Sequence, residues 1–250
     1  MDTLTLSNTQ LKALLQYRQQ KHCDDAGLFV VEGVKLCNEA LQQGISVRCL
    51  CATADYFEKY KPSTSSVYVV SETQLERLSL LRCPNKVWML CERPDMEVRA
   101  TDDASLILAL DGIQDPGNMG TILRTADWFG IRTILCSNGT VSCFNPKVVQ
   151  ATMGAIFRTS VQYCNLADKV RLLHMQGYSI YGALLDGENI TGIRNTSKSI
   201  LIIGNEGHGI SPEVTTLVDH RITIPNIGGT CESLNAAIAT AIALYQFSCR

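Results

Sequence analysis

The chain has 250 residues, of which 46% are hydrophobic, and its formal net charge is −2. This length allows one large domain or two of ordinary size with real cores, which excludes a disordered chain. No stretch approaches roughly 18 apolar residues free of charge, and the amino end lacks a basic segment followed by an apolar run. We therefore expect a soluble, cytoplasmic protein. Its slightly acidic balance argues against a broadly basic nucleic-acid-binding surface, so any phosphate contacts need Lys and Arg gathered locally.

The chain contains eleven cysteines, and they lie inside apolar strand and helix patterns. A chain of this length does not need disulfide bonds to hold its core together, so reduced thiols are expected. There is no CxxC pair and no cysteine and histidine cluster with zinc-ligand spacing. We expect no metal site.

The first 90 residues alternate between helical and strand patterns. An amphipathic, locally basic helix is expected within residues 4–23, and its charged face is either simply solvated or a contact for phosphates. Leu28 to Gly33 predicts a strand and a turn, and the helix that follows ends at Gly44. Further strands are expected at 47–52, 67–70 and 87–91, and helices at 55–59 and 72–81. A polar stretch at 92–103, which contains Pro94, predicts a linker.

The remaining residues also alternate between strands and helices. Strands are expected at 105–110, 132–136, 160–162, 179–184, 199–203 and 222–224. Helices are expected at 119–129, 146–153, 168–176, from 212, and from 234 to 247. Such alternation indicates an α/β fold with a mainly parallel sheet covered on both faces.

Three of these strands run into loops rich in glycine or polar residues. The first loop leads into a helix near Asn118, the second spans 204–212, and the third follows Pro225 and contains Gly228 and Gly229. Ser233 is suited to cap the last helix, which is apolar around nearly its whole circumference and is therefore expected to be buried in the core or against a second copy. Each loop alone reads as an ordinary turn. Together they indicate one shared pocket, and the GxxGxG spacing of the second argues against a dinucleotide fold.

The order and spacing of these motifs resemble the SpoU/TrmH family of the SPOUT superfamily. The residues that carry the resemblance are Asn118, Gly120 and Arg124 to Ala126, then Gly204 to Glu206 with Gly209, then Ile224, Pro225 and Ser233 to Asn235. The resemblance implies an RNA ribose 2′-O-methyltransferase that uses S-adenosylmethionine, with a carboxy-terminal trefoil knot and a homodimer formed through the knot region. Such a knot departs from the usual rule that chains do not thread loops.

The amino-terminal segment Phe29 to Gly33 resembles the start of the small substrate-binding domain that precedes the catalytic domain in many family members. That domain is similar to RNA-binding proteins of the large ribosomal subunit. We therefore expect an RNA substrate-binding domain at 1–95 and a methyltransferase domain at 104–250.

The resemblance also assigns roles to individual residues. The catalytic residues that it implies are Arg124, Asn118, Glu206, Ser233 and Asn235. The cofactor-binding residues that it implies are Leu184, Gly204, Asn205, Gly209, Ile224, Ser233 and Leu234.

Arg124 is a poor general base, because a guanidinium stays protonated. We expect it to orient the phosphate or the ribose hydroxyl and to stabilise the developing alkoxide. The simpler alternative is a salt bridge to a nearby carboxylate. A buried Glu206 is expected either to hold Arg124 in place or to accept the proton, and the sequence leaves both open.

Ribosomal RNA is the favoured substrate, because the amino-terminal domain stands where transfer-RNA enzymes carry their extensions. Two alternatives remain open: a transfer-RNA 2′-O-methyltransferase, and a non-catalytic RNA-binding factor for ribosome assembly. In the family an arginine often stands where this chain has Gln150. The glutamine removes a phosphate contact that the arginine implies, and Lys147 and Arg158 are possible substitutes for it.

Overall fold

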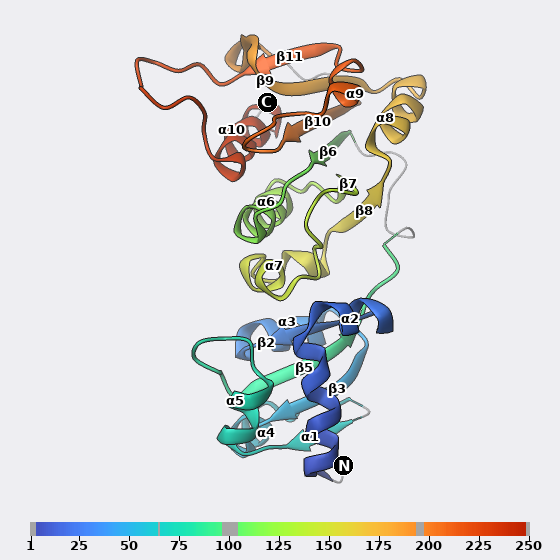
Figure 1. The fold of residues 1–250 in the computed structure, drawn as a ribbon, viewed down its shortest axis with the longest axis vertical. Helices are drawn as coiled ribbons and strands as arrows, with labels where there is room; N and C mark the ends of the chain where they lie inside the picture. Colours follow the sequence, from blue (N-terminus) through green and yellow to red (C-terminus); the bar gives the residue numbers. More distant parts are fainter. Residues whose placement is uncertain (1–3, 65, 97–104, 194–197, 249–250) are drawn as a thin grey trace. The chain divides into compact units, whose positions relative to one another are not determined.

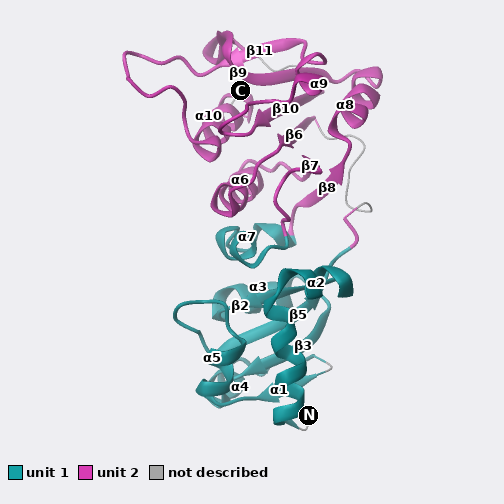
Figure 2. Cartoon of the chain, in the orientation of Figure 1, with its two compact units in different colours: residues 1–94, 144–157 teal, residues 95–143, 158–250 magenta. Residues whose placement is uncertain are grey.

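The computed structural model describes residues 4–64, 66–96, 105–193 and 198–248. The chain divides into two compact units (Figure 2). Unit 1 comprises residues 1–94 and 144–157, and unit 2 comprises residues 95–143 and 158–250. The segment 144–157 thus groups with unit 1, whereas the expected boundaries place it in the second domain; those boundaries stay a prediction.

Residues 97–103 of the expected linker lie outside the described residues. Within the described ranges, no helix has both the length and the apolar character needed to cross a membrane.

Unit 1 is built on a mixed five-stranded sheet (Figure 1). Its strands are β1 (Leu4–Thr5), β2 (Leu28–Glu32), β3 (Val47–Ala52), β4 (Val67–Val69) and β5 (Val87–Glu92), in the order β1-β4-β3-β5-β2. Its helices are α1 (Asn8–Leu15), η1 (Gln16–Arg18), α2 (Gln20–Ala26), α3 (Val34–Gln42), α4 (Ala54–Tyr60), α5 (Glu72–Leu78), α7 (Pro146–Ala151) and η2 (Ala155–Phe157). β5 runs antiparallel to both β2 and β3, while β4 runs parallel to β3 and β1.

The single helix expected within residues 4–23 is wrong, because this segment forms a short strand and three helical pieces. Ser7 begins α1 with a capping box in which its side chain and that of Gln10 each accept a hydrogen bond from the other's backbone N–H. Gln19 has an extended backbone, with φ −95° and ψ 124°, and separates η1 from α2. Gly27 then ends α2 in the left-handed conformation, with φ 65°.

The segment 144–157 packs on β2 within unit 1. The rings of Phe144 and Phe29 lie 4.9 Å apart between centroids. Gln150 Nε2 donates a hydrogen bond of 2.9 Å to the carbonyl oxygen of Glu32. Gln150 therefore has a structural contact inside the unit at the position where the family often carries an arginine.

Unit 2 is built on a six-stranded sheet whose pairings are all parallel. Its strands are β6 (Leu106–Asp111), β7 (Thr133–Ser137), β8 (Ser160–Cys164), β9 (Ser179–Asn189), β10 (Ser199–Gly204) and β11 (His220–Thr223), in the order β11-β9-β10-β6-β7-β8. Its helices are α6 (Pro116–Trp128), α8 (Leu166–Met175), η3 (Ile190–Gly192), α9 (Pro212–Thr215) and α10 (Ala236–Ser248). The predicted α/β class with a mainly parallel sheet is confirmed, whereas the trefoil knot stays a prediction.

The core of unit 2 is formed by apolar side chains between the sheet and its covering helices. Ile107, Ile180, Ile200 and Ile202 are among its buried members. Because β6, β10 and β11 belong to one parallel sheet, their carboxyl ends lie at the same edge. The three motif loops leave the sheet at that edge, which is where α/β sheets bind ligands.

Candidate active site

The first motif begins in the first turn of α6. Asp115 caps this helix, since its carboxylate accepts a hydrogen bond of 2.8 Å from the backbone N–H of Asn118, and Pro116 follows as the first helical residue. These two residues fix the start of α6 directly after the loop that leaves β6. The cap orients Asn118 at the helix terminus, with its side chain free to make contacts beyond the helix.

Asn118 joins all three motifs through its side chain. Its Nδ2 donates a short hydrogen bond to Oε1 of Glu206 in the second loop. Its Oδ1 accepts a hydrogen bond of 2.8 Å from Nδ2 of Asn235 in the third. Three residues that are far apart in the sequence therefore form one hydrogen-bonded chain.

Asn235, and not Ser233, caps the last helix. Its Oδ1 accepts hydrogen bonds from the backbone N–H groups of Ala237, at 3.0 Å, and Ile238, at 3.3 Å. The expectation that Ser233 is the cap is wrong, because α10 begins only at Ala236. Asn235 thus has two tasks: one end of its amide starts the helix and the other reaches Asn118.

Asn205 shapes the second loop. Its Nδ2 donates to the carbonyl of Gly112 at 2.7 Å, which ties the loop to the end of β6. Its Oδ1 accepts from the backbone N–H groups of Gly207, at 2.8 Å, and His208, at 3.1 Å. The main chains of Asn205 and Gly209 exchange two hydrogen bonds of 2.9 Å each, so the loop is a closed turn.

Gly204 and Gly209 are glycines for different reasons. A Cβ at Gly204 would lie 2.2 Å from the carbonyl carbon of Gly209, so no side chain fits there. Gly209 has φ +70° with open space around it, so its requirement is conformational. The second loop consequently folds back so closely on the end of β10 that only glycine fits at position 204.

Two further residues stabilise the loops of the site through hydrogen bonds, and neither was predicted from the sequence. Asp111, buried at the end of β6, accepts a hydrogen bond of 2.8 Å from the backbone N–H of Ser211. Asn226 closes the third loop, because its Oδ1 accepts from the N–H of Gly229 at 2.7 Å and its Nδ2 donates to the carbonyl of Cys231 at 3.2 Å. An acidic residue at the end of an apolar strand and an asparagine shortly before paired glycines were the available signals.

Arg124 is exposed on α6, and among the residues that the structure describes no carboxylate pairs with it. The nearby carboxylate of Asp127 pairs instead with Arg132, at 3.0 Å, and with Arg158, at 2.8 Å. The alternative of a salt bridge for Arg124 is therefore not what this structure contains. Its guanidinium keeps its donors available for a ligand.

Glu206 is exposed, so the expectation of a buried carboxylate is wrong. It accepts a hydrogen bond from Asn118 and makes no ion pair with Arg124 in the described chain. The role that this contact gives Glu206 is to orient the amide of Asn118.

The remaining predicted cofactor residues lie on the same loops or on a neighbouring strand. Ile224 is partly buried just after β11, while Ser233 and Leu234 are exposed before α10. Leu184, on β9, is partly buried and packs against the core of unit 2.

Two protein families match separate parts of the chain. Residues 105–245 match the SpoU rRNA Methylase family, and residues 8–88 match the MRM3-like substrate binding domain. The 23S rRNA (guanosine(2553)-2′-O)-methyltransferase RlmP of Bacillus subtilis is 31% identical over 96% of this chain and 96% of its own length.

Solved structures give the same result. A putative RNA methyltransferase of the TrmH family from Porphyromonas gingivalis is 39% identical, with a TM-score of 0.86 over 97% of this chain and 98% of that one. An rRNA methyltransferase from Sinorhizobium meliloti with bound AdoMet is 28% identical, with a TM-score of 0.85 over 98% of this chain and 96% of that one. The family predicted from the three motifs is confirmed: the chain belongs to the SpoU rRNA methylase family of RNA methyltransferases.

Proposed function

We propose that the chain transfers the methyl group of S-adenosylmethionine to a ribose 2′-hydroxyl of RNA, with ribosomal RNA as the favoured substrate. The observation that carries this proposal is the hydrogen-bonded chain from Glu206 through Asn118 to Asn235, which draws the three motif loops to one sheet edge. The relative from Bacillus subtilis, which by its name methylates 23S rRNA, supports the choice of substrate.

The loop residues fit S-adenosylmethionine. Leu234 and Ile227 expose 47% and 94% of their surfaces on the third loop, which offers apolar contact for an adenine ring. At Gly204 the closeness of the second loop leaves no room for a side chain, so backbone groups form the surface there. The site also presents the neutral amides of Asn118 and Asn235 and the exposed carboxylate of Glu206, groups that are compatible with a cationic sulfonium.

When bound, this cofactor supplies a methyl group that its sulfonium charge already activates. The protein then has to bring the ribose hydroxyl into line with it and exclude competing water. Arg124 serves this purpose as a donor of hydrogen bonds: it binds the phosphate or hydroxyl oxygen of the reacting nucleotide and stabilises the alkoxide as it forms.

Asn118, Asn235 and Glu206 hold the site in shape for this step. Glu206 accepts from Nδ2 of Asn118, so Oδ1 of Asn118 faces Asn235. Ser233, which is exposed and does not cap α10, keeps its hydroxyl available for the substrate or the cofactor. The site residues are thus divided between orientation of the loops and contact with ligands.

The proposal includes a homodimer formed through α10. The inner face of this helix is buried, yet Ile238, Ile242 and Tyr245 expose 52%, 38% and 61% of their surfaces. The ring of Tyr245 packs edge-on against that of Phe129, the residue that follows α6, at 6.5 Å between centroids, so the apolar surface continues from α10 to the end of α6. A second copy that covers this face explains why the helix is apolar around its circumference.

The proposed location is the cytoplasm, where ribosomal RNA is available.

Methyl transfer tests the proposal against its alternatives. Purified protein is incubated with labelled S-adenosylmethionine and either ribosomal or transfer RNA, and the modified nucleotide is mapped. We expect label in ribosomal RNA at a ribose 2′-oxygen. Label in transfer RNA alone would favour the transfer-RNA enzyme, and binding of RNA without any label would favour the non-catalytic assembly factor.

A further inference from the structure

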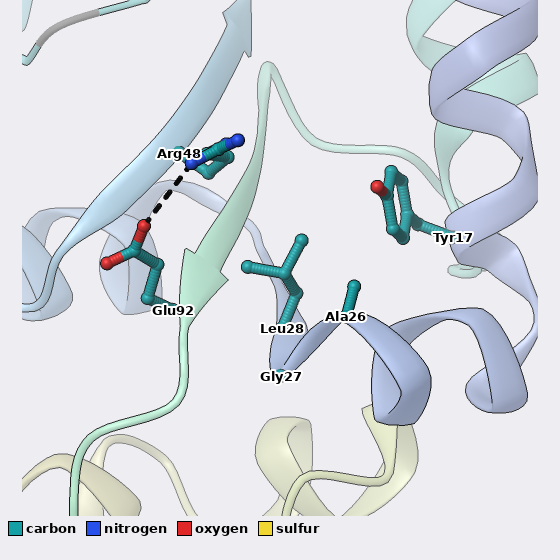
Figure 3. Close-up of a pocket in the computed structure, with 6 residues that line it drawn as sticks. All are labelled: Tyr17, Ala26, Gly27, Leu28, Arg48 and Glu92. Atoms are coloured by element: carbon teal, nitrogen blue, oxygen red, sulfur yellow. Dashed lines mark ion pairs between the residues drawn. The ribbon is translucent and has the colours of Figure 1, made fainter.

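Unit 1 contains a hollow of about 380 Å³ (Figure 3). It is lined by Tyr17, Ala26, Gly27, Leu28, Arg48 and Glu92. All of these residues lie in the amino-terminal part of the chain, whereas the motif loops belong to unit 2. The volume falls within the range of about 300–1,000 Å³ that is usual for ligand pockets. The hollow is therefore a candidate binding site separate from the methyltransferase motifs.

The floor of the hollow is held in place by hydrogen bonds from Arg93 to the main chain. Leu28 is buried at the start of β2, and Gly27 ends α2 with no side chain to fill the space. Arg93 binds the main chain of both residues. Its backbone N–H donates to the carbonyl of Gly27 at 2.9 Å, and its Nε donates to the carbonyl of Leu28 at 3.0 Å. These two hydrogen bonds connect the end of β5 to the start of β2 beneath the hollow.

One side of the hollow is aromatic. In Figure 3 the ring of Tyr17 lies on one side of Leu28, and Arg48 and Glu92 lie on the other. Tyr17 is partly buried, and its carbonyl accepts a hydrogen bond of 3.2 Å from the thiol of Cys23 in α2. The Tyr17 side chain also packs against the core of unit 1. An aromatic ring beside an apolar floor is a surface on which unstacked bases of single-stranded RNA bind.

The other side of the hollow carries the guanidinium of Arg48, which a bulge in the sheet positions there. In the pairing of β3 with β5, Val47 lies opposite Cys91 and Cys49 lies opposite Leu90, so Arg48 is an extra residue in a bulge. Bulges redirect side chains, and they are frequent beside functional sites. The Arg48 side chain is 69% exposed, although the sheet around it is buried.

Glu92 lies beside this arginine with hydrogen-bonding capacity left over. Its Oε2 accepts a hydrogen bond of 2.8 Å from Ser46 Oγ. Its Oε1 is 3.7 Å from Nη1 of Arg48, which is an ion-pair distance but too long for a hydrogen bond. The Arg48 guanidinium thus presents N–H donors next to the two carboxylate oxygens of Glu92, and both side chains can make further hydrogen bonds to a ligand.

We propose that this hollow binds one unstacked base of the RNA substrate, and that guanine is the preferred base; the inference rests on the proposed function in taking RNA as the substrate. Guanine carries two adjacent N–H donor groups beside the O6 acceptor, which complements a carboxylate beside a guanidinium. Adenine and cytosine each offer a single donor group on that edge, and uracil offers one N–H between two acceptors. The base stacks on Tyr17, its N–H groups donate to Glu92, and Arg48 donates to O6.

Binding of short labelled oligonucleotides to the full-length protein tests the inference by fluorescence anisotropy. The probes are an oligouridine and the same oligouridine with one central guanosine or one central adenosine. We expect the guanosine to tighten binding about tenfold over the other two probes. Glu92→Gln should abolish that gain, so that the variant binds the guanosine probe no more tightly than the oligouridine. Equal affinity for the guanosine and adenosine probes, or a gain that survives in Glu92→Gln, would overturn the inference.

Matched variants control for charge and packing. Arg48→Gln should remove the preference for guanosine, whereas Arg77→Gln, which removes another exposed arginine of the same unit, on α5, should keep it. Tyr17→Ala should weaken binding of the guanosine probe about tenfold, while Tyr17→Phe retains the ring and should retain the affinity. If Arg77→Gln and Arg48→Gln behave alike, binding depends on overall charge and the hollow is not the site.

The same preparations separate this inference from the proposed function. Methyl transfer to ribosomal RNA together with unaltered oligonucleotide binding in all hollow variants would refute the hollow alone. A guanosine preference that depends on Glu92, without any methyl transfer by the wild-type chain, would support the hollow and refute the proposed function.

Discussion

Nδ2 of Asn235 donates a hydrogen bond of 2.8 Å to Oδ1 of Asn118 across 117 positions of the sequence. The same amide of Asn118 donates to Glu206, so its two ends are committed to two different loops. A change in any of these three residues therefore disturbs the other two, and the caps and loops of the site behave as a connected unit.

Asn235 and Ser233 should differ in their effects on stability. Asn235→Ala removes the cap of α10 and should lower the free energy of unfolding by about 1 kcal/mol. Ser233→Ala should change it by less than about 0.5 kcal/mol, because Ser233 is exposed and caps nothing. Urea denaturation of both variants measures the difference, and equal losses would contradict the assignment of the cap to Asn235.

Arg124→Ala should abolish most methyl transfer while leaving the affinity for S-adenosylmethionine nearly unchanged. The loss of one donor to developing negative charge typically lowers kcat about 100- to 1,000-fold. Calorimetric titration with the cofactor and a labelled-methyl assay give the two quantities. Arg171→Ala, which removes an exposed arginine paired with Asp168 and Glu213, is the control and should leave both unchanged. Loss of cofactor binding in Arg124→Ala would refute its role toward the nucleotide.

Gly204→Ala and Gly207→Ala form a matched pair in the second loop. A Cβ at Gly204 would lie 2.2 Å from the carbonyl carbon of Gly209, so the loop has to move, at a cost of about 1–3 kcal/mol in stability and with loss of cofactor affinity. At Gly207 the nearest atom, Oδ1 of Asn205, would be 3.5 Å from the new Cβ, so this variant should bind the cofactor normally. Thermal unfolding and cofactor titration test both, and similar behaviour of the two variants would argue against the close fit at Gly204.

Ile242→Glu should prevent dimerisation by placing a charge on the exposed apolar face of α10. The matched control is Met175→Glu, because Met175 is an exposed apolar residue on a different helix, α8. Sedimentation velocity should give a monomer for the first variant and a dimer for the second. A wild-type chain that sediments as a monomer at all concentrations would exclude the proposed dimer.

Glu32 should make the stability of unit 1 depend on pH. Burial raises the pKa of the Glu32 carboxyl above its usual 4.5, against the opposing effects of hydrogen bonds from Ser79 and Leu80 and of the charge of Arg18. The folded chain then binds this proton more tightly than the unfolded chain does, so the contribution of Glu32 to the free energy of unfolding falls as the pH rises from about 4.5 through its folded pKa.

Glu32→Gln removes this titration and keeps an acceptor for Leu80. Relative to this variant, the wild type should lose stability as the pH rises through that window, as measured by urea denaturation at several pH values. Glu76→Gln, at an exposed position of α5, leaves Glu32 in place and should therefore keep the loss of stability through that window. Parallel curves for wild type and Glu32→Gln would refute the assignment.

Local patterns predicted the strands well, because apolar runs bounded by turns contain most of what defines a strand. The bounds expected for β3 are those observed, Val47–Ala52. The patterns failed where distant contacts decide. Gln19 interrupts the first helix without any Gly or Pro, and the choice of Asn235 over Ser233 as a cap depends on where the final helix docks, including the contact with Asn118.

The exposure of Glu206 was missed for a similar reason. The sequence places a carboxylate between glycines but does not say which way the loop closes, and the closure depends on the hydrogen bonds from Asn205 to Gly112, Gly207 and His208. The motifs identified the residues of the site, whereas their exposure and partners came from contacts between segments that periodicity does not encode.

The insertion of β10 between β6 and β9 has a consequence for synthesis of the protein. Both neighbours precede β10 in the chain, so while the ribosome is still translating, the facing sides of Leu106–Asp111 and of Ser179 to Gly182 in β9 lack their final partner. Unpaired strand sides are templates for aggregation, and contacts between remote segments form slowly. Nascent chains that stop before Ser199 should therefore be far more dependent on chaperones than the completed protein.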